Sequence, residues 1–290
     1  MTAKLNKKLF EIFCIIKSAN RDQADLVAEF LFSIGANYRD VTVLTKKGIF
    51  RISIYFKNQK KAENFKTKLD NFRLKGVSFK LREVKIENWK EKWAKNFSPF
   101  QLTKTIDVVP TWRKKSYKKT KRTPIYLSSI NAFGTGLHET TSFMAELVEQ
   151  KKDKFSSFFD IGTGTGLLAL VALHNGAKDV LAIDFNQDCV KSAKENFEVN
   201  KSKALIQKAD IGEFKIKKVF DFVAANLITH DLTKFKRELV SFVGPRGFLA
   251  ISGISLENLS LIKETFRALP LRCIKIKRGK QWVALLYKRA

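Results

Sequence analysis

A glycine-rich segment is the clearest candidate for ligand chemistry in this sequence. Gly162, Gly164 and Gly166 lie within five residues, after a predicted strand over 156–160 and before a predicted helix that begins at Leu167. Glycine is needed where the backbone turns sharply or where a ligand presses against the main chain without a Cβ in the way. Dinucleotide sites use the spacing G-x-G-x-x-G, and the third glycine here comes one residue early. The segment therefore predicts either a tight turn or a ligand site of another type.

Two polar residues end later predicted strands. Asp184 closes the strand over 179–184 and lies 22 positions beyond Gly162 (184 − 162 = 22), and a carboxylate there can accept both hydroxyls of a ribose. Asn226 follows the strand over 220–225, at the strand end where ligands bind in open parallel sheets. A turn-forming Asn is the alternative for this position.

Two motifs carry a resemblance to a known family. Asp160 and the glycine spacing resemble the first motif of class I S-adenosylmethionine methyltransferases. Upstream, residues 132–141 read Ala-Phe-Gly-Thr-Gly-Leu-His-Glu-Thr-Thr and resemble the hallmark of the bacterial ribosomal protein L-eleven methyltransferases, the PrmA family. Leu137 and Glu139 depart from that family's pattern, where Thr and Pro are common at these places. The resemblance runs from residue 89 to residue 254, and over the N-terminal domain it rests on the predicted fold alone.

This resemblance implies a cofactor, a reaction and a substrate. The cofactor is S-adenosylmethionine, its expected contacts are Thr141, Gly162, Gly164, Asp184 and Asn226, and no metal is expected. The reaction is methyl transfer to amines of a ribosomal protein, at lysine side chains and the N-terminus. The small N-terminal domain is expected to recognise that protein.

The expected chemistry needs alignment more than a reactive side chain. A methyl group on a sulfonium is already an activated electrophile, so the enzyme must hold a neutral amine in line with it and exclude water. We expect Asn226 to accept a hydrogen bond from this amine, while Thr141 and His138 shape the mouth of the site. His138 either acts as a base or orders its loop.

The elements that must position these residues form two predicted domains. Residues 1–86 follow the order β-α-β-β-α-β of a small α+β ferredoxin-like domain. Residues 127–290 alternate strands and helices, which predicts an α/β Rossmann-like class I methyltransferase domain, doubly wound and mainly parallel, with a terminal antiparallel hairpin. Residues 87–126 are predicted to be a linker helix, with Trp89 and Trp93 on one face, followed by a basic loop.

Charge is unevenly distributed along the chain. The 290 residues hold 55 Lys plus Arg and 28 Asp plus Glu, a net charge of +27. By region the excess is +12 over residues 1–99, +7 over 100–126 and +8 over 127–290. The run 113–122 has no apolar period and predicts an exposed loop, which either only aids solubility or contacts phosphates. A free ribosomal protein is itself basic, so we expect the combined +19 (12 + 7) to favour substrate that is bound to RNA or to the ribosome.

The sequence is also compatible with three functions other than methylation of this ribosomal protein. A ribosomal RNA methyltransferase would suit the charge, although no Pro-Pro-aromatic wall follows Asn226 and no aromatic RNA-binding signature appears. The chain could instead methylate a lysine of a different protein, or bind the cofactor without turnover. Cys14, Cys189 and Cys273 are expected to be buried thiols in a reducing compartment. No segment predicts a membrane span, and we expect a cytoplasmic protein. We also expect it to be a monomer.

Overall fold

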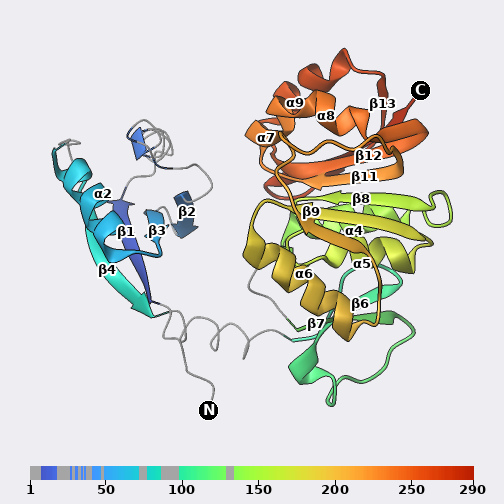
Figure 1. The fold of residues 1–290 in the computed structure, drawn as a ribbon, viewed down its shortest axis with the longest axis horizontal. Coiled ribbons are helices and arrows are strands. Elements are labelled where there is room, and N and C mark those ends of the chain that lie inside the picture. Colours follow the sequence, from blue (N-terminus) through green and yellow to red (C-terminus); the bar gives the residue numbers. More distant parts are fainter. Residues whose placement is uncertain are drawn as a thin grey trace. The chain divides into compact units, whose positions relative to one another are not determined.

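The computed structural model covers the chain as two compact units, residues 1–96 and 97–290. Figure 1 shows both units coloured along the sequence, and each is described by itself. The described residues are 8–17, 27, 30, 31, 34, 36, 41–46, 49–71, 77–85, 98–128 and 134–290. The predicted Trp89 and Trp93 helix and most of a predicted helix over 20–35 lie outside them. In the part of the chain that is described, no helix is long and apolar enough to cross a membrane.

The N-terminal unit is built on an antiparallel sheet of four strands in the order β2-β3-β1-β4. Its apolar side chains alternate along the strands, and Ile12, Cys14 and Ile52 meet Phe65 and Leu69 of the helix in one core. All four predicted strands are confirmed, in the ferredoxin-like order. The elements are β1 (Lys8–Lys17), β2 (Val41–Lys46), β3 (Ile49–Phe56), α2 (Gln59–Asn71) and β4 (Lys80–Lys85).

A buried acid lies on the same sheet. Glu11 of β1 is 1% exposed and accepts hydrogen bonds from Arg51 at 2.9 Å, Arg82 at 2.6 Å and Ser53 at 2.7 Å. Burial raises the pKa of Glu11, but the bonds from Ser53 and the two arginines outweigh it and hold the pKa below its usual value. The charges of β1, β3 and β4 are therefore partly neutralised by each other.

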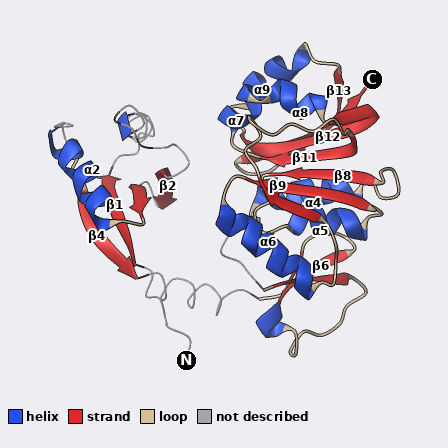
Figure 2. Ribbon diagram, viewed as in Figure 1, coloured by secondary structure: helices blue, strands red, loops and turns tan. Residues whose placement is uncertain are grey.

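The larger unit contains a sheet of seven strands in the order β10-β9-β8-β11-β12-β14-β13. The first five strands in that order pair in parallel, and β14 pairs antiparallel with both β12 and β13. Helices cover both faces, as Figure 2 shows: α4, α5 and α6 contribute to one core and α7, α8 and α9 to the other. The doubly wound sheet and its terminal hairpin are confirmed. The strands are β8 (Ser157–Ile161), β9 (Asp179–Asp184), β10 (Leu205–Lys208), β11 (Phe220–Asn226), β12 (Val243–Ser255), β13 (Leu271–Arg278) and β14 (Trp282–Arg289). The helices are α4 (Glu139–Glu149), α5 (Leu167–His174), α6 (Gln187–Val199), α7 (Thr229–Lys234), α8 (Lys236–Ser241) and α9 (Leu259–Arg267).

Residues 98–126 belong to the larger unit and contain strands where we expected a connecting segment. They form most of a three-stranded sheet in the order β5 (Phe100–Gln101), β6 (Ile106–Pro110) and β7 (Thr123–Leu127). The physical reason is burial, because the apolar side chains of β6 and β7 join one core of the larger unit. The predicted basic loop is exposed, as expected, and it connects the parallel strands β6 and β7.

Candidate functional site

The glycine loop turns the chain from β8 into α5 and contacts the carboxyl end of β9. The backbone N–H groups of Gly162 and Thr163 both donate to the Ile183 carbonyl oxygen, at 2.9 and 3.0 Å. Gly162 has a φ of +73°, and a Cβ there would lie 2.6 Å from Leu227 Cδ2. A side chain at this position would therefore be strained and would displace Leu227. The sharp turn, one of the two expected reasons for glycine, applies here, and the close neighbour at Gly162 is the Leu227 side chain.

Asp184 faces this loop from the end of β9. Its Oδ2 accepts from the Gly164 N–H at 3.0 Å and its Oδ1 accepts from the Asn186 N–H at 2.9 Å. The carboxylate is 5% exposed. A carboxylate has about four acceptor positions, and these two backbone bonds fix the orientation of both oxygens. The structure therefore brings Gly164 and Asp184 together, as the sequence predicted.

Asp160, the acid of the same motif, differs from Asp184 in its surroundings and in its pKa. It is 1% exposed, and Thr163 Oγ1 donates to its Oδ2 at 2.7 Å. Burial raises the pKa of Asp160 to about 7, and the nearby Asp184 charge adds to that rise. Its Oδ1 has no hydrogen-bond partner among the described residues. Burial therefore favours the protonated form of Asp160, whereas the Asp184 carboxylate accepts the hydrogen bond from the glycine loop.

Asn226 lies at the carboxyl end of β11, beside the start of α4. Its Nδ2 donates to Thr140 Oγ1 at 3.3 Å and to Thr141 Oγ1 at 3.4 Å. These contacts confirm that Asn226 and Thr141 meet, although they are 85 residues apart in the sequence. The Asn226 Oδ1 is buried and has no hydrogen-bond partner among the described residues. An unpaired buried acceptor costs about 1–3 kcal/mol, so this atom suits a ligand that brings an N–H group.

His138 orders the start of α4. It is the N-cap residue of this helix, and its Nδ1 lies 2.8 Å from Thr140 Oγ1. Its ring also packs edge-on against Trp282 of β14, with centroids 5.1 Å apart. Burial lowers the pKa of His138, so the ring is neutral near pH 7. Of the two roles expected for His138, this geometry favours ordering of the loop.

Sequence reasoning missed one residue that joins these parts. Asn196 of α6 is fully buried, its Nδ2 donates to the Thr165 carbonyl oxygen at 2.8 Å, and its Oδ1 accepts from the Ser128 N–H at 2.8 Å. One turn later, Asn200 exchanges two hydrogen bonds with the backbone of Tyr126, at 2.8 and 2.6 Å. The available signal was two asparagines four residues apart on one helix face.

Asp210, the cysteines and a possible metal site remain to be placed. Asp210 lies beyond β10, where its Oδ1 accepts from the Gly212 N–H at 2.9 Å, the geometry of a turn. Cys14 is buried and Cys189 is half-buried, but Cys273 is exposed, so the expectation of three buried thiols was wrong for Cys273. The reason is that β13 is an edge strand, whose side chains are largely uncovered. Among the described residues, no group of three or more His, Cys, Asp and Glu side chains is placed to hold a metal ion.

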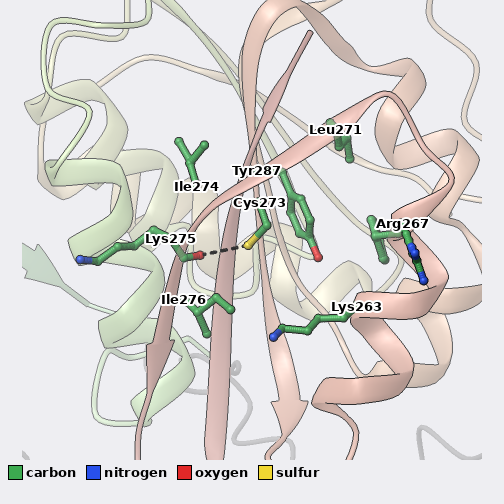
Figure 3. A pocket seen from close by; sticks show the side chains of 9 residues that line it. Lys263, Arg267, Leu271, Cys273, Ile274, Lys275, Ile276 and Tyr287 are labelled. Carbon is green, nitrogen blue, oxygen red and sulfur yellow. Dashed lines mark hydrogen bonds between the residues drawn. The ribbon is translucent and has the colours of Figure 1, made fainter.

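Cys273 lines a pocket at this edge of the sheet, away from every predicted site residue. Figure 3 shows side chains of α9 on one side of the pocket and of β13 on the other. Cys273 Sγ lies 3.7 Å from the Lys275 carbonyl oxygen. The lining of this pocket includes neither the glycine loop nor Asp184 nor Asn226. The pocket is therefore separate from the carboxyl ends of β8, β9 and β11.

The residues at the carboxyl ends of β8, β9 and β11 fit a nucleoside cofactor. Gly162 supplies a backbone without a Cβ, Asp184 supplies an oriented carboxylate, and Asn226 supplies an unpaired acceptor. At β12, Gly253 has a φ of +89°, and a Cβ there would overlap the Leu227 carbonyl oxygen. The absence of a side chain at Gly253 therefore lets the backbone that follows β11 pack directly against β12, at the edge where the ligand would lie.

Comparison with known proteins agrees with the family resemblance that the sequence motifs indicated. The family model described as "Ribosomal protein L11 methyltransferase (PrmA)" matches residues 18–290. A ribosomal protein L11 methyltransferase of Sorangium cellulosum is 32% identical over 240 residues, covering 80% of this chain and 75% of that protein. The enzyme of the same name from Ruminiclostridium cellulolyticum is 29% identical over 289 residues, covering 94% of this chain and 85% of that protein. The crystal structure of ribosomal protein L11 methylase from Lactobacillus delbrueckii subsp. bulgaricus is similar at a TM-score of 0.61 and 27% identity, over 67% of this chain and 99% of that one.

Proposed function

Because the chain belongs to the ribosomal protein L11 methyltransferase family, PrmA, we propose that it methylates amines of ribosomal protein L11 at a site centred on Asn226. It is an S-adenosylmethionine-dependent protein methyltransferase. Within that activity, the residues that hold the cofactor, the role of Asn226 and the state of the substrate are the parts that we propose.

The cofactor is proposed to lie along the carboxyl ends of β8 and β9. Bound S-adenosylmethionine supplies a methyl group that is already activated for transfer. The Asp184 carboxylate accepts hydrogen bonds from the ribose hydroxyls, and the turned backbone at Gly162 and Gly164 lies against the cofactor. Thr141 and Asn226 close the other side of the site, from α4 and β11.

One observation carries the role of Asn226, namely its buried and unpaired Oδ1. Thr140 and Thr141 hold the amide from its Nδ2 side, which leaves the oxygen as the acceptor that a substrate amine can use. A lysine amine has a pKa of about 10.4 in water and must be neutral to attack. Removal of water at this edge lowers that pKa, because burial disfavours the charged form. Asn226 Oδ1 then accepts an N–H of the neutral amine and fixes the direction of its lone pair.

His138 acts in this proposal as a positioning residue. Its ring is neutral near pH 7 and holds Thr140, which in turn contacts Asn226. The lysine ammonium gives its proton to water at the mouth of the site, as burial of the side chain lowers its pKa. No acidic or basic side chain is therefore required to take part in the transfer itself.

The N-terminal unit is proposed to recognise the ribosomal protein. It has its own core and its own sheet, and none of the proposed cofactor contacts lies within residues 1–96. We further propose that the enzyme works as a monomer in the cytoplasm. In this assignment the smaller unit selects the substrate and the larger unit performs the transfer.

A ribosomal RNA methyltransferase is the second candidate, because the exposed basic loop suits a phosphate backbone. The two functions differ in which component gains the methyl group. The test is incubation of the enzyme and labelled S-adenosylmethionine with purified ribosomal protein L11, with naked ribosomal RNA, and with undermethylated ribosomes. Label in the ribosomal protein supports our proposal, and label only in RNA would overturn it.

A further inference from the structure

The basic loop, residues 113–122, has a sequence that would repel itself if it were a free coil. It contains seven Lys and Arg residues and no acid. Self-repulsion should leave such a run extended in solvent. In the structure the loop instead crosses from β6 to the parallel strand β7, and its path is fixed by contacts.

A single buried acid fixes this loop. Asp107 of β6 is 3% exposed, and it accepts hydrogen bonds from Tyr117 Oη at 2.8 Å, Thr120 Oγ1 at 2.7 Å and Arg122 Nε at 2.6 Å. Burial raises its pKa, but the bonds from Thr120, Arg122 and Tyr117 outweigh burial and hold the pKa below its usual value. Asp107 therefore holds the loop through three side chains. It is the only acid within residues 100–126, so this segment contains no second carboxylate that could pair with the lysines.

The lysines form an exposed cationic surface. None of them makes a salt bridge with a described residue, and Lys114 Nζ lies 4.6 Å from the centre of the Tyr126 ring. Beside them, Trp112 is 41% exposed. The exposed lysines are Lys114, Lys115, Lys118, Lys119 and Lys121.

This surface is tied to the cofactor edge. The backbone of Tyr126 in β7 exchanges hydrogen bonds with Asn200, and the Ser128 N–H donates to Asn196. Asn196 in turn donates to the Thr165 carbonyl oxygen of the glycine loop. A molecule held on the lysines would thus be held in a fixed place relative to the site of transfer.

We infer that the basic loop binds the phosphate backbone of RNA, so that a ribosomal protein already bound to RNA is brought to the enzyme. Lysines act as point charges for phosphates, and their binding needs no particular base sequence. The charge of a nucleic acid repeats at every nucleotide, so several lysines along one loop can each meet a phosphate. The delivery of substrate rests on the proposed function, whereas RNA binding by the loop does not.

The test measures binding of a fluorescent ribosomal RNA fragment to the full chain across a range of salt concentrations. The triple variant K115Q/K118Q/K119Q should weaken binding about tenfold or more and lower the slope of log affinity against log salt by about two to three. The control variant K203Q/K215Q/K217Q removes three exposed lysines elsewhere in the same unit and should bind nearly as the parent does. An unchanged slope in the loop variant, or an equal loss in the control, would overturn the inference.

A second variant separates fixed geometry from total charge. Asp107→Ala raises the net charge by one, yet it should weaken RNA binding, because Tyr117, Thr120 and Arg122 lose their common anchor. Tighter binding would show that charge alone matters and would contradict the role of Asp107. Thermal unfolding and cofactor binding report whether this variant folds, and if it does not, the lysine variant decides the question.

Two further measurements keep this inference distinct from the proposed function. K115Q/K118Q/K119Q should methylate free ribosomal protein as the parent does and ribosome-bound protein more slowly. Failure of the parent on every ribosomal protein would contradict the proposed function while leaving RNA binding by the loop intact. Displacement of the RNA by polyglutamate as effectively as by unlabelled RNA of equal charge would contradict RNA as the partner.

Discussion

The cofactor edge and the basic loop belong to the same unit but present very different groups. At the cofactor edge the ligand would meet backbone, two hydroxyls, the Asn226 amide and a carboxylate whose oxygens are already oriented. In the basic loop a partner would meet five exposed lysines held around one buried acid. The side chains of the first arrangement are largely buried and their hydrogen bonds are directional, so salt should matter little to ligand binding there. The second depends on exposed charge, which salt screens. Chemistry and docking can therefore be separated by experiment.

The largest expected effect is on cofactor binding. Asp184→Ala should raise the dissociation constant for S-adenosylmethionine at least about 100-fold. Two hydrogen bonds from ribose hydroxyls to a charged group, at about 1.5–3 kcal/mol each, would be lost. Isothermal titration calorimetry measures the change, with Asp179→Ala, at the opposite end of the same strand, as the control. Parent affinity in Asp184→Ala would remove this carboxylate from the cofactor site.

The link between the two regions should matter next. Asn196→Ala should lower the free energy of unfolding by about 2–4 kcal/mol, because the Ser128 N–H and the Thr165 carbonyl group lose their buried partner. Chemical denaturation measures the loss. Asn258→Ala should cost much less, because Asn258 is half-buried and its Nδ2 lies 3.5 Å from Thr229 Oγ1, at the long limit for a hydrogen bond. Equal losses in the two variants would show that the hydrogen bonds of Asn196 contribute no more to stability than the weak contact of Asn258.

A smaller effect concerns pH. The pKa of Asp160 is raised by burial from 3.8 to about 7. Between these values the folded state keeps a proton that the unfolded state has lost, so stability falls as pH rises, by at most about 1.4 kcal/mol per pH unit. Asp160→Asn should flatten this part of the profile. Thermal melts of parent and variant from pH 4 to pH 8 measure it, and identical slopes would mean that Asp160 ionises normally.

The smallest expected effect is none at all. In K115Q/K118Q/K119Q the affinity for S-adenosylmethionine should stay within about twofold of the parent, at low and at high salt. The lysines are exposed and form no contact with the glycine loop. A cofactor affinity that falls with the lysine charges would show that the two regions are not independent.

The sequence predicted these two regions unequally. The glycine spacing, Asp184, Asn226 and the alternation of strands and helices follow from local patterns, and all of them are where a doubly wound sheet would place them. Contacts between distant residues were not predictable, because Glu11 looks like an ordinary polar position in a strand and Asp107 lies in a segment that was expected to be a linker. Only the fold brings Arg122 to the first and Arg51 and Arg82 to the second. The three-stranded sheet was missed for a related reason, since its strands are short and β5 has two residues.

Methyl transfer at the cofactor edge depends most on the unpaired Oδ1 of Asn226, which is proposed to position the substrate amine. The direct measurement is the turnover number of Asn226→Ala on ribosomal protein L11, with cofactor affinity determined in parallel. Loss of one buried hydrogen bond that aligns the amine should lower kcat by about 10- to 100-fold while cofactor affinity falls much less. A kcat equal to that of the parent, with the cofactor still bound, would contradict this role of Asn226.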